Sequence, residues 1–155
     1  MKYAESVFFE SAEDKGLFVN LFIPTVLIWK ERKMEVKLET HFPSDTKVRI
    51  SFKGKGQVFP LHIRYPKWAV NGLKVTLNGE ERMIQGTPGS YFTLKERWSD
   101  NTTLTIDIPM SLYTVSMPDN PKRMGIFYGP ILLAAPLGKG DVKIYDISHF
   151  ISDSG

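Results

Sequence analysis

The chain contains no cysteine among its 155 residues. This absence excludes disulfide bonds, thiolate metal sites and a cysteine nucleophile within the chain, but it leaves the cellular compartment open. Long apolar runs are also missing, because no stretch approaches the roughly 20 residues of a membrane-spanning helix. The first residues lack the apolar segment of a signal peptide. We therefore expect no membrane partner.

Charge and reactive side chains are equally sparse. The net charge of +3 comes without a dense basic stripe or base-reading motif, so nucleic acid is not an expected partner. His41, His62 and His149 share no metal-ligand spacing, which argues against a metal site. No nucleophile elbow and no phosphate-binding glycine loop appears. A hydrolytic carboxylate pair stays open as an alternative, because separation in space is invisible in a sequence.

The residues that are present favour one β-rich domain. Apolar residues make up 42% of the chain and aromatic residues 12%, which is enough for a sandwich core. Strict alternation of apolar and polar residues predicts strands at residues 46–53 and 59–65, and a third strand with Val75 and Leu77 on one face. These strands are expected to form a meander that ends in the hairpin turn Asn78-Gly79.

If the first two strands of this meander pair, their outward residues would make a mildly basic face. A solvated surface is the default interpretation of this face, and binding of an acidic polysaccharide is the alternative. The residues concerned are Lys47, Arg49, Lys53, Lys55, His62 and Arg64.

Further strands are expected on both sides of the meander. Residues 17–23 are apolar on both faces, which predicts a strand covered on both sides. Residues 124–135 predict two buried strands, or one bent at Gly129-Pro130. Residues 2–9 are ambiguous: helical spacing favours a short helix or frayed lead-in, whereas residues 7–9 alone would suit a strand. The fold predicted is all-β, an antiparallel sandwich of jelly-roll type.

Three tryptophans are the best binding candidates. Trp29, Trp68 and Trp98 each lie at a predicted strand end or turn, where an exposed ring could stack on a sugar. Indole rings also close sandwich cores. The sequence leaves both interpretations open.

Several phrases occur together in the order found in one enzyme family. Residues 14–24 read DKGLFVNLFIP, and residues 61–69 read LHIRYPKWA. Pro88-Gly89-Ser90-Tyr91, Trp98, Ile108-Pro109-Met110, Pro118-Asp119-Asn120-Pro121 and Tyr128-Gly129-Pro130 follow. In this order the phrases resemble the bacterial β-L-arabinofuranosidase family, glycoside hydrolase family 127 and relatives.

The resemblance implies a parent enzyme with an (α/α)6 catalytic barrel, a cysteine nucleophile and a zinc ion held by cysteine and glutamate. Its β-sandwich domains would be accessory. No catalytic or zinc-binding residue carries over to this chain, so no cofactor is expected in it. The chain resembles a C-terminal sandwich domain, with residues 1–15 as a lead-in from the last barrel helix, 16–147 as the sandwich and 148–155 as a frayed tail.

The predicted function is that of a non-catalytic accessory domain that packs on and supports the catalytic barrel. The residues expected at that interface are Phe8, Phe9, Phe18 and Phe22. Two alternatives are a carbohydrate-binding module that uses the tryptophans and an oligomerisation domain that self-associates. Periplasmic, extracellular and cytoplasmic locations all stay open.

Overall fold

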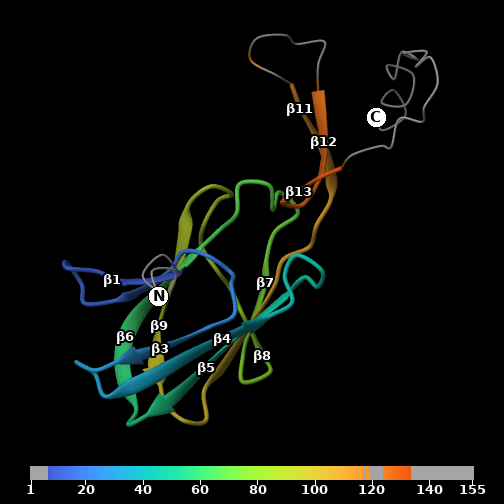
Figure 1. Ribbon diagram of the computed structural model, residues 1–155. Helices are drawn as coiled ribbons and strands as arrows, with labels where there is room; N and C mark the ends of the chain where they lie inside the picture. The colour runs from blue at the N-terminus through green and yellow to red at the C-terminus, as the bar shows by residue number, and fades with distance from the viewer. Residues whose placement is uncertain (1–6, 117, 119–123, 134–155) are drawn as a thin grey trace, which may run out of the picture.

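A computed structural model describes residues 7–116, 118 and 124–133. This part of the chain forms thirteen strands in three sheets (Figure 1). The four-stranded sheet has the order β1 (Phe8–Glu10), β2 (Leu17–Val19), β6 (Gln57–Arg64) and β9 (Tyr91–Trp98). The six-stranded sheet has the order β3 (Thr25–Trp29), β4 (Met34–Thr40), β5 (Lys47–Gly54), β10 (Thr103–Asp107), β7 (Lys74–Leu77) and β8 (Glu80–Arg82).

A separate three-stranded sheet has the order β11 (Leu112–Ser116), β12 (Met124–Tyr128) and β13 (Ile131–Leu132). All neighbouring strands in the three sheets are antiparallel except β2 and β6.

The two larger sheets face each other across one apolar core, which confirms the predicted all-β sandwich. Alternate residues of β5 and β6 point into this core, as the period of two requires. Phe52 on β5 stacks on Trp98 of β9, with ring centroids 4.6 Å apart. Trp29 on β3 meets Phe59 of β6 edge-on at 5.2 Å. The jelly-roll type stays a prediction.

The predicted pairing of the strands at 46–53 and 59–65 is wrong. β5 pairs with β4 and β10, whereas β6 pairs with β2 and β9 in the opposite sheet. Each strand has its own apolar row, and two such rows are buried best when they face each other across a core. Residues 54–56 therefore cross between the sheets. The basic face that this pairing would have made does not form, because Lys47 and Arg49 lie on one sheet and His62 and Arg64 on the other.

The predicted helical or frayed lead-in is wrong for Phe8–Glu10. These residues form strand β1, which pairs with β2. Phe8 of β1 and Val7 just before it are buried in the core, whereas Phe9 is exposed. Residues 1–6 lie outside the described residues.

The predicted hairpin at Asn78-Gly79 is confirmed. The φ angles are +51° at Asn78 and +87° at Gly79, and Leu77 pairs with Glu80 across the turn. Positive φ at both central residues defines the type I′ turn, which Asn-Gly adopts most readily.

Residues 124–133 form the two expected strands, β12 and β13, on either side of Gly129-Pro130. Their predicted burial is wrong, because Ile126 and Leu132 are exposed. The β11–β13 sheet lies beside the sandwich and not inside its core (Figure 1). The predicted tail at 148–155 and His149 lie outside the described residues.

Candidate functional site

A row of aromatic rings crosses the outer side of the four-stranded sheet. Direct cross-strand partners place Phe9 of β1 beside Phe18 of β2, and Phe18 beside His62 of β6. The centroids of Phe9 and Phe18 are 4.6 Å apart with an interplanar angle of 7°. Phe18 and His62 follow at 4.3 Å and 27°, and Tyr91 of β9 meets Phe18 edge-on at 5.2 Å. We call Phe9, Phe18, His62 and Tyr91 the aromatic face.

The stacking determines which parts of the rings in the aromatic face are accessible to a partner. Phe18 is stacked on Phe9 with one ring face and on His62 with the other, so its ring offers mainly an edge to the outside. Phe9 remains 42% exposed and Phe18 is half-buried. A sugar stacks on an open ring face, whereas a packed protein surface accepts edges and faces alike. This geometry suits contact with another protein surface better than contact with a sugar.

Hydrogen bonds hold the His62 ring in place from both nitrogens. Nε2 lies 2.8 Å from Oδ2 of Asp14, and Nδ1 lies 2.8 Å from Oγ1 of Thr93. Hydrogen bonds from the Ser11 hydroxyl and the Gly16 N–H, together with His62, lower the pKa of the Asp14 carboxyl to about 2. Asp14 therefore stays ionised as a partner for His62 in all but strongly acidic solution.

Gly16 brings the turn before β2 close enough to β6 for this contact. A Cβ at Gly16 would lie 2.6 Å from the Pro60 carbonyl oxygen and 2.8 Å from His62 Nε2. Any other residue here would push the turn, and Asp14 with it, away from His62.

A second polar group supports the Tyr91 side of the aromatic face. The Tyr91 hydroxyl donates to Asn20 Oδ1 at 2.6 Å, and Arg64 Nη1 donates to the same oxygen at 3.0 Å. Together with the His62 bonds, these contacts fix the side chains before any partner arrives, which lowers the entropy cost of binding.

The four predicted interface residues divide into two pairs. Phe9 and Phe18 lie on the aromatic face, as a barrel interface would need. Phe8 and Phe22 do not, because Phe8 is only 3% exposed and Phe22 packs edge-on against Phe42 in the core. Adjacent strand residues point to opposite sides of a sheet, so Phe8 and Phe9 cannot share one surface.

Two of the three tryptophans belong to the core. Trp98 is fully buried and donates its indole N–H to the Phe59 carbonyl at 2.8 Å. Trp29 is buried, and the Arg32 guanidinium covers its ring at 4.8 Å. Neither ring can serve as a sugar platform.

Trp68 is different, because it is only partly buried. It stacks on Phe42 at 5.8 Å and lines a groove of about 460 Å³ with Phe42 and Arg64. Carbohydrate binding stays a prediction at this one ring.

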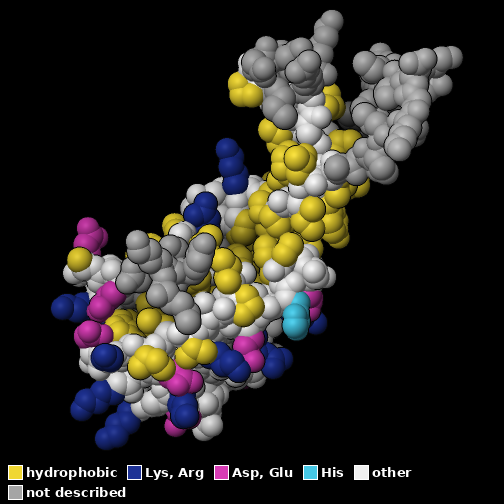
Figure 2. Space-filling view, viewed as in Figure 1, with side chains coloured by type: hydrophobic (Ala, Val, Ile, Leu, Met, Phe, Trp, Pro, Cys, Tyr) yellow, Lys and Arg dark blue, Asp and Glu magenta, His cyan; other side chains and the backbone are white. Residues whose placement is uncertain are grey.

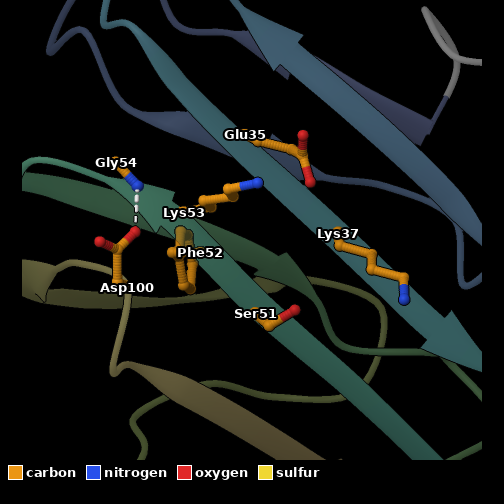
Figure 3. A pocket seen from close by; sticks show the side chains of 7 residues that line it. All are labelled: Glu35, Lys37, Ser51, Phe52, Lys53, Gly54 and Asp100. Atoms are coloured by element: carbon orange, nitrogen blue, oxygen red, sulfur yellow. Dashed lines mark hydrogen bonds between the residues drawn. The ribbon is translucent and has the colours of Figure 1, made fainter.

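The outer side of β4 and β5, which we call the charged face, is polar and balanced. A hollow of about 610 Å³ is lined by Glu35, Lys53 and Asp100 among others (Figure 3). Lys53 is the direct cross-strand partner of Glu35, and it lies between Glu35 and Asp100 in Figure 3. Asp100 accepts a hydrogen bond from the Gly54 N–H at 2.5 Å. With Lys53 between the two carboxylates, this arrangement does not favour a hydrolytic acid pair.

Within the described residues, no three His, Asp or Glu side chains gather as a metal site. The zinc implied by the family resemblance needs cysteine and glutamate ligands, and this chain has no cysteine. The same part of the chain holds no helix long and apolar enough to span a membrane.

Comparison with known protein families identifies the domain. Residues 16–110 match the family model described as "Beta-L-arabinofuranosidase, GH127 middle domain". The chain belongs to the GH127 middle-domain family. The description places this domain in the middle of the family's chain, whereas the sequence had suggested a C-terminal position.

Solved structures share the fold of this GH127 middle domain. A GH127 beta-L-arabinofuranosidase from Geobacillus stearothermophilus T6 superposes with a TM-score of 0.70 at 24% identity, over 84% of this chain and 21% of that one. A structure described as a glycoside hydrolase gives 0.69 at 19% identity, over 81% and 22% of the two chains. A GH127 beta-arabinofuranosidase gives 0.68 at 18%, over 81% and 23%. The chain thus spans about a fifth of their length. No curated protein matches it.

Proposed function

We propose that this GH127 middle domain is a non-catalytic accessory domain of a glycoside hydrolase. In this proposal it packs through the aromatic face on the catalytic domain of the parent enzyme and supports that assembly. The names of the structural relatives support a glycoside hydrolase as the parent. Their length supports a partner elsewhere in the same protein, because this domain matches only about a fifth of each relative.

The observation that carries the proposal is the contrast between the two outer sides of the sandwich. The charged face pairs opposite charges across strands, as Glu35 with Lys53 and Glu39 with Arg49. The aromatic face instead exposes Phe9 beside a ring row that is held rigid by hydrogen bonds. Protein interfaces are enriched in aromatic residues and depleted in lysine and glutamate, which favours the aromatic face as the contact surface.

The isolated chain is expected to show no glycosidase activity, because it lacks the cysteine nucleophile and the zinc ligands that the family resemblance implies. The purified chain is incubated with arabinofuranosides and a panel of aryl glycosides, with and without zinc. A heat-treated sample is the control. Zinc-dependent turnover well above that control would contradict the proposal.

Removing the exposed rings should lower the thermal stability of the parent enzyme more than that of the isolated domain. In the parent, Phe9→Ser with Phe18→Ser takes apolar area out of the contact with the catalytic domain, so the thermal midpoint of that domain should fall. Calorimetry of the parent and of the isolated chain gives the comparison. Lys37→Ser with Lys53→Ser on the charged face is the matched control and should leave both midpoints unchanged. Equal losses in the parent and in the isolated chain would count against packing through the aromatic face.

A further inference from the structure

The β11–β13 sheet does not pair with either larger sheet, although Ile131 lines the same groove as Trp68 of the sandwich. Its three strands bond only to one another within the described residues. It begins at Leu112, beyond residues 16–110 that match the family model. In Figure 1, β11 and β12 extend away from the sandwich, and the edge strand β11 pairs with neither larger sheet.

The β11–β13 sheet is apolar on both sides and carries no charge. Leu112, Ile126 and Tyr128 lie on one face, and all three are exposed. Val115 and Leu132 belong to the opposite face and are exposed as well. None of the three strands contains lysine, arginine, aspartate or glutamate. Figure 2 shows hydrophobic side chains gathered where this sheet leaves the sandwich, while charged ones cluster at the far end.

The edge strand β11 also lacks the usual protection against strand pairing. Charged side chains on an edge strand disfavour pairing with another chain. The edge strand β8 reads EER, and the edge strand β9 contains Lys95, Glu96 and Arg97. By contrast, β11 reads LYTVS, with high strand propensity and neither charge nor proline. The edge strand β3, which reads TVLIW, is likewise uncharged.

The sequence of β11 is complementary to itself in an antiparallel register. When Thr114 is placed on a two-fold axis, it faces Thr114 of the second copy, and Tyr113 faces Val115 of the other strand. Thr–Thr pairs and aromatic–β-branched pairs are among the favourable cross-strand combinations. Because β11 has no charge, this pairing brings no like charges together.

We propose that β11 pairs antiparallel with β11 of a second copy of this chain. Two β11–β13 sheets then join into one six-stranded sheet around an axis at Thr114, and Leu112 of one copy lies opposite Ser116 of the other. Such a contact is isologous, as two-fold dimers require. The proposal does not depend on the catalytic partner, and its test uses the isolated chain alone.

A single introduced cysteine tests which residues lie opposite each other in the dimer, because the natural chain contains no cysteine that could form a competing disulfide. Directly opposite residues of antiparallel strands have Cβ atoms roughly 4.5–5.5 Å apart, and a small strand movement brings them to the roughly 3.5–4.5 Å of a disulfide. Thr114→Cys should therefore form a disulfide-linked dimer under mild oxidation. Ile28→Cys is the control: Ile28 is similarly exposed on β3, an uncharged edge of the six-stranded sheet. Crosslinking of Thr114→Cys at or below the level of Ile28→Cys would overturn the register.

Association itself is measured by sedimentation velocity over a range of concentrations. The natural chain should dimerise, and Thr114→Lys should raise the dissociation constant about tenfold or more, because two ammonium groups then face each other across the axis. Ile28→Lys should leave the dissociation constant unchanged. Circular dichroism confirms that each variant is folded, and Thr114→Val checks that a neutral change preserves the dimer. A monomeric natural chain, or a dimer that only Ile28→Lys disrupts, would refute the proposal.

Discussion

Trp98→Ala is expected to lower the free energy of unfolding by about 3–5 kcal/mol. The indole is fully buried between the two larger sheets, where it stacks on Phe52 at 4.6 Å. Its removal leaves a large cavity, and it also takes the N–H donor away from the Phe59 carbonyl. A loss of this size is a large part of the total stability of a small domain.

Urea denaturation of the natural chain and of Trp98→Ala measures this difference. Val58→Ala on the neighbouring strand β6 is the control, because Val58 is 56% exposed and its truncation should change stability by only about 0.5 kcal/mol. A loss below about 1 kcal/mol for Trp98→Ala would mean that the ring does not close the core.

Phe8→Ser and Phe9→Ser should have very different effects although the residues are neighbours. Phe8 is 3% exposed and Phe9 is 42% exposed. Phe8→Ser removes a core ring and buries a hydroxyl, so we expect about 3–5 kcal/mol of destabilisation. Phe9→Ser in the isolated chain should cost about 1 kcal/mol or less, because the ring already touches water. Denaturation of both variants tests this, and equal losses would show that the two rings are not on opposite sides of β1.

Alternation was enough to predict the strands but not their partners. Val48, Ile50 and Phe52 recur at every second residue, which fixes a strand with one buried side. The same pattern is satisfied whether the next apolar strand lies beside it or across the core from it. For this reason β5 and β6 were predicted as neighbours, although they lie in opposite sheets.

The aromatic face was predicted only in part. Residues 17–23 are apolar at almost every position, so period-two reasoning could not tell which rings point inward. Phe18 lies on the outside and Phe22 in the core. Asp14 and His62 are 48 positions apart in the sequence, and no local sequence pattern predicts that they are in contact. The outward direction of His62 did follow from the alternation in β6.

The tryptophans show the same limit of sequence reasoning. A ring at a strand end can close the core or face the solvent, and the choice depends on how the sheets pack. Trp98 ends β9 and Trp29 ends β3, and both turn inward to cover Phe59. Because both indoles pack in the core, we infer that their role is structural.

Hydroxyl-radical footprinting tests the packing of the aromatic face most directly. Side-chain oxidation rates are measured at Phe9 and Phe18 in the isolated chain and in the full-length parent enzyme. Met83, which is 96% exposed, is the reference for an open side chain. If the domain packs through its aromatic face, the rates at Phe9 and Phe18 should fall severalfold in the parent while the rate at Met83 stays the same. Equal rates at Phe9 in the two proteins would contradict packing of this face on the catalytic domain.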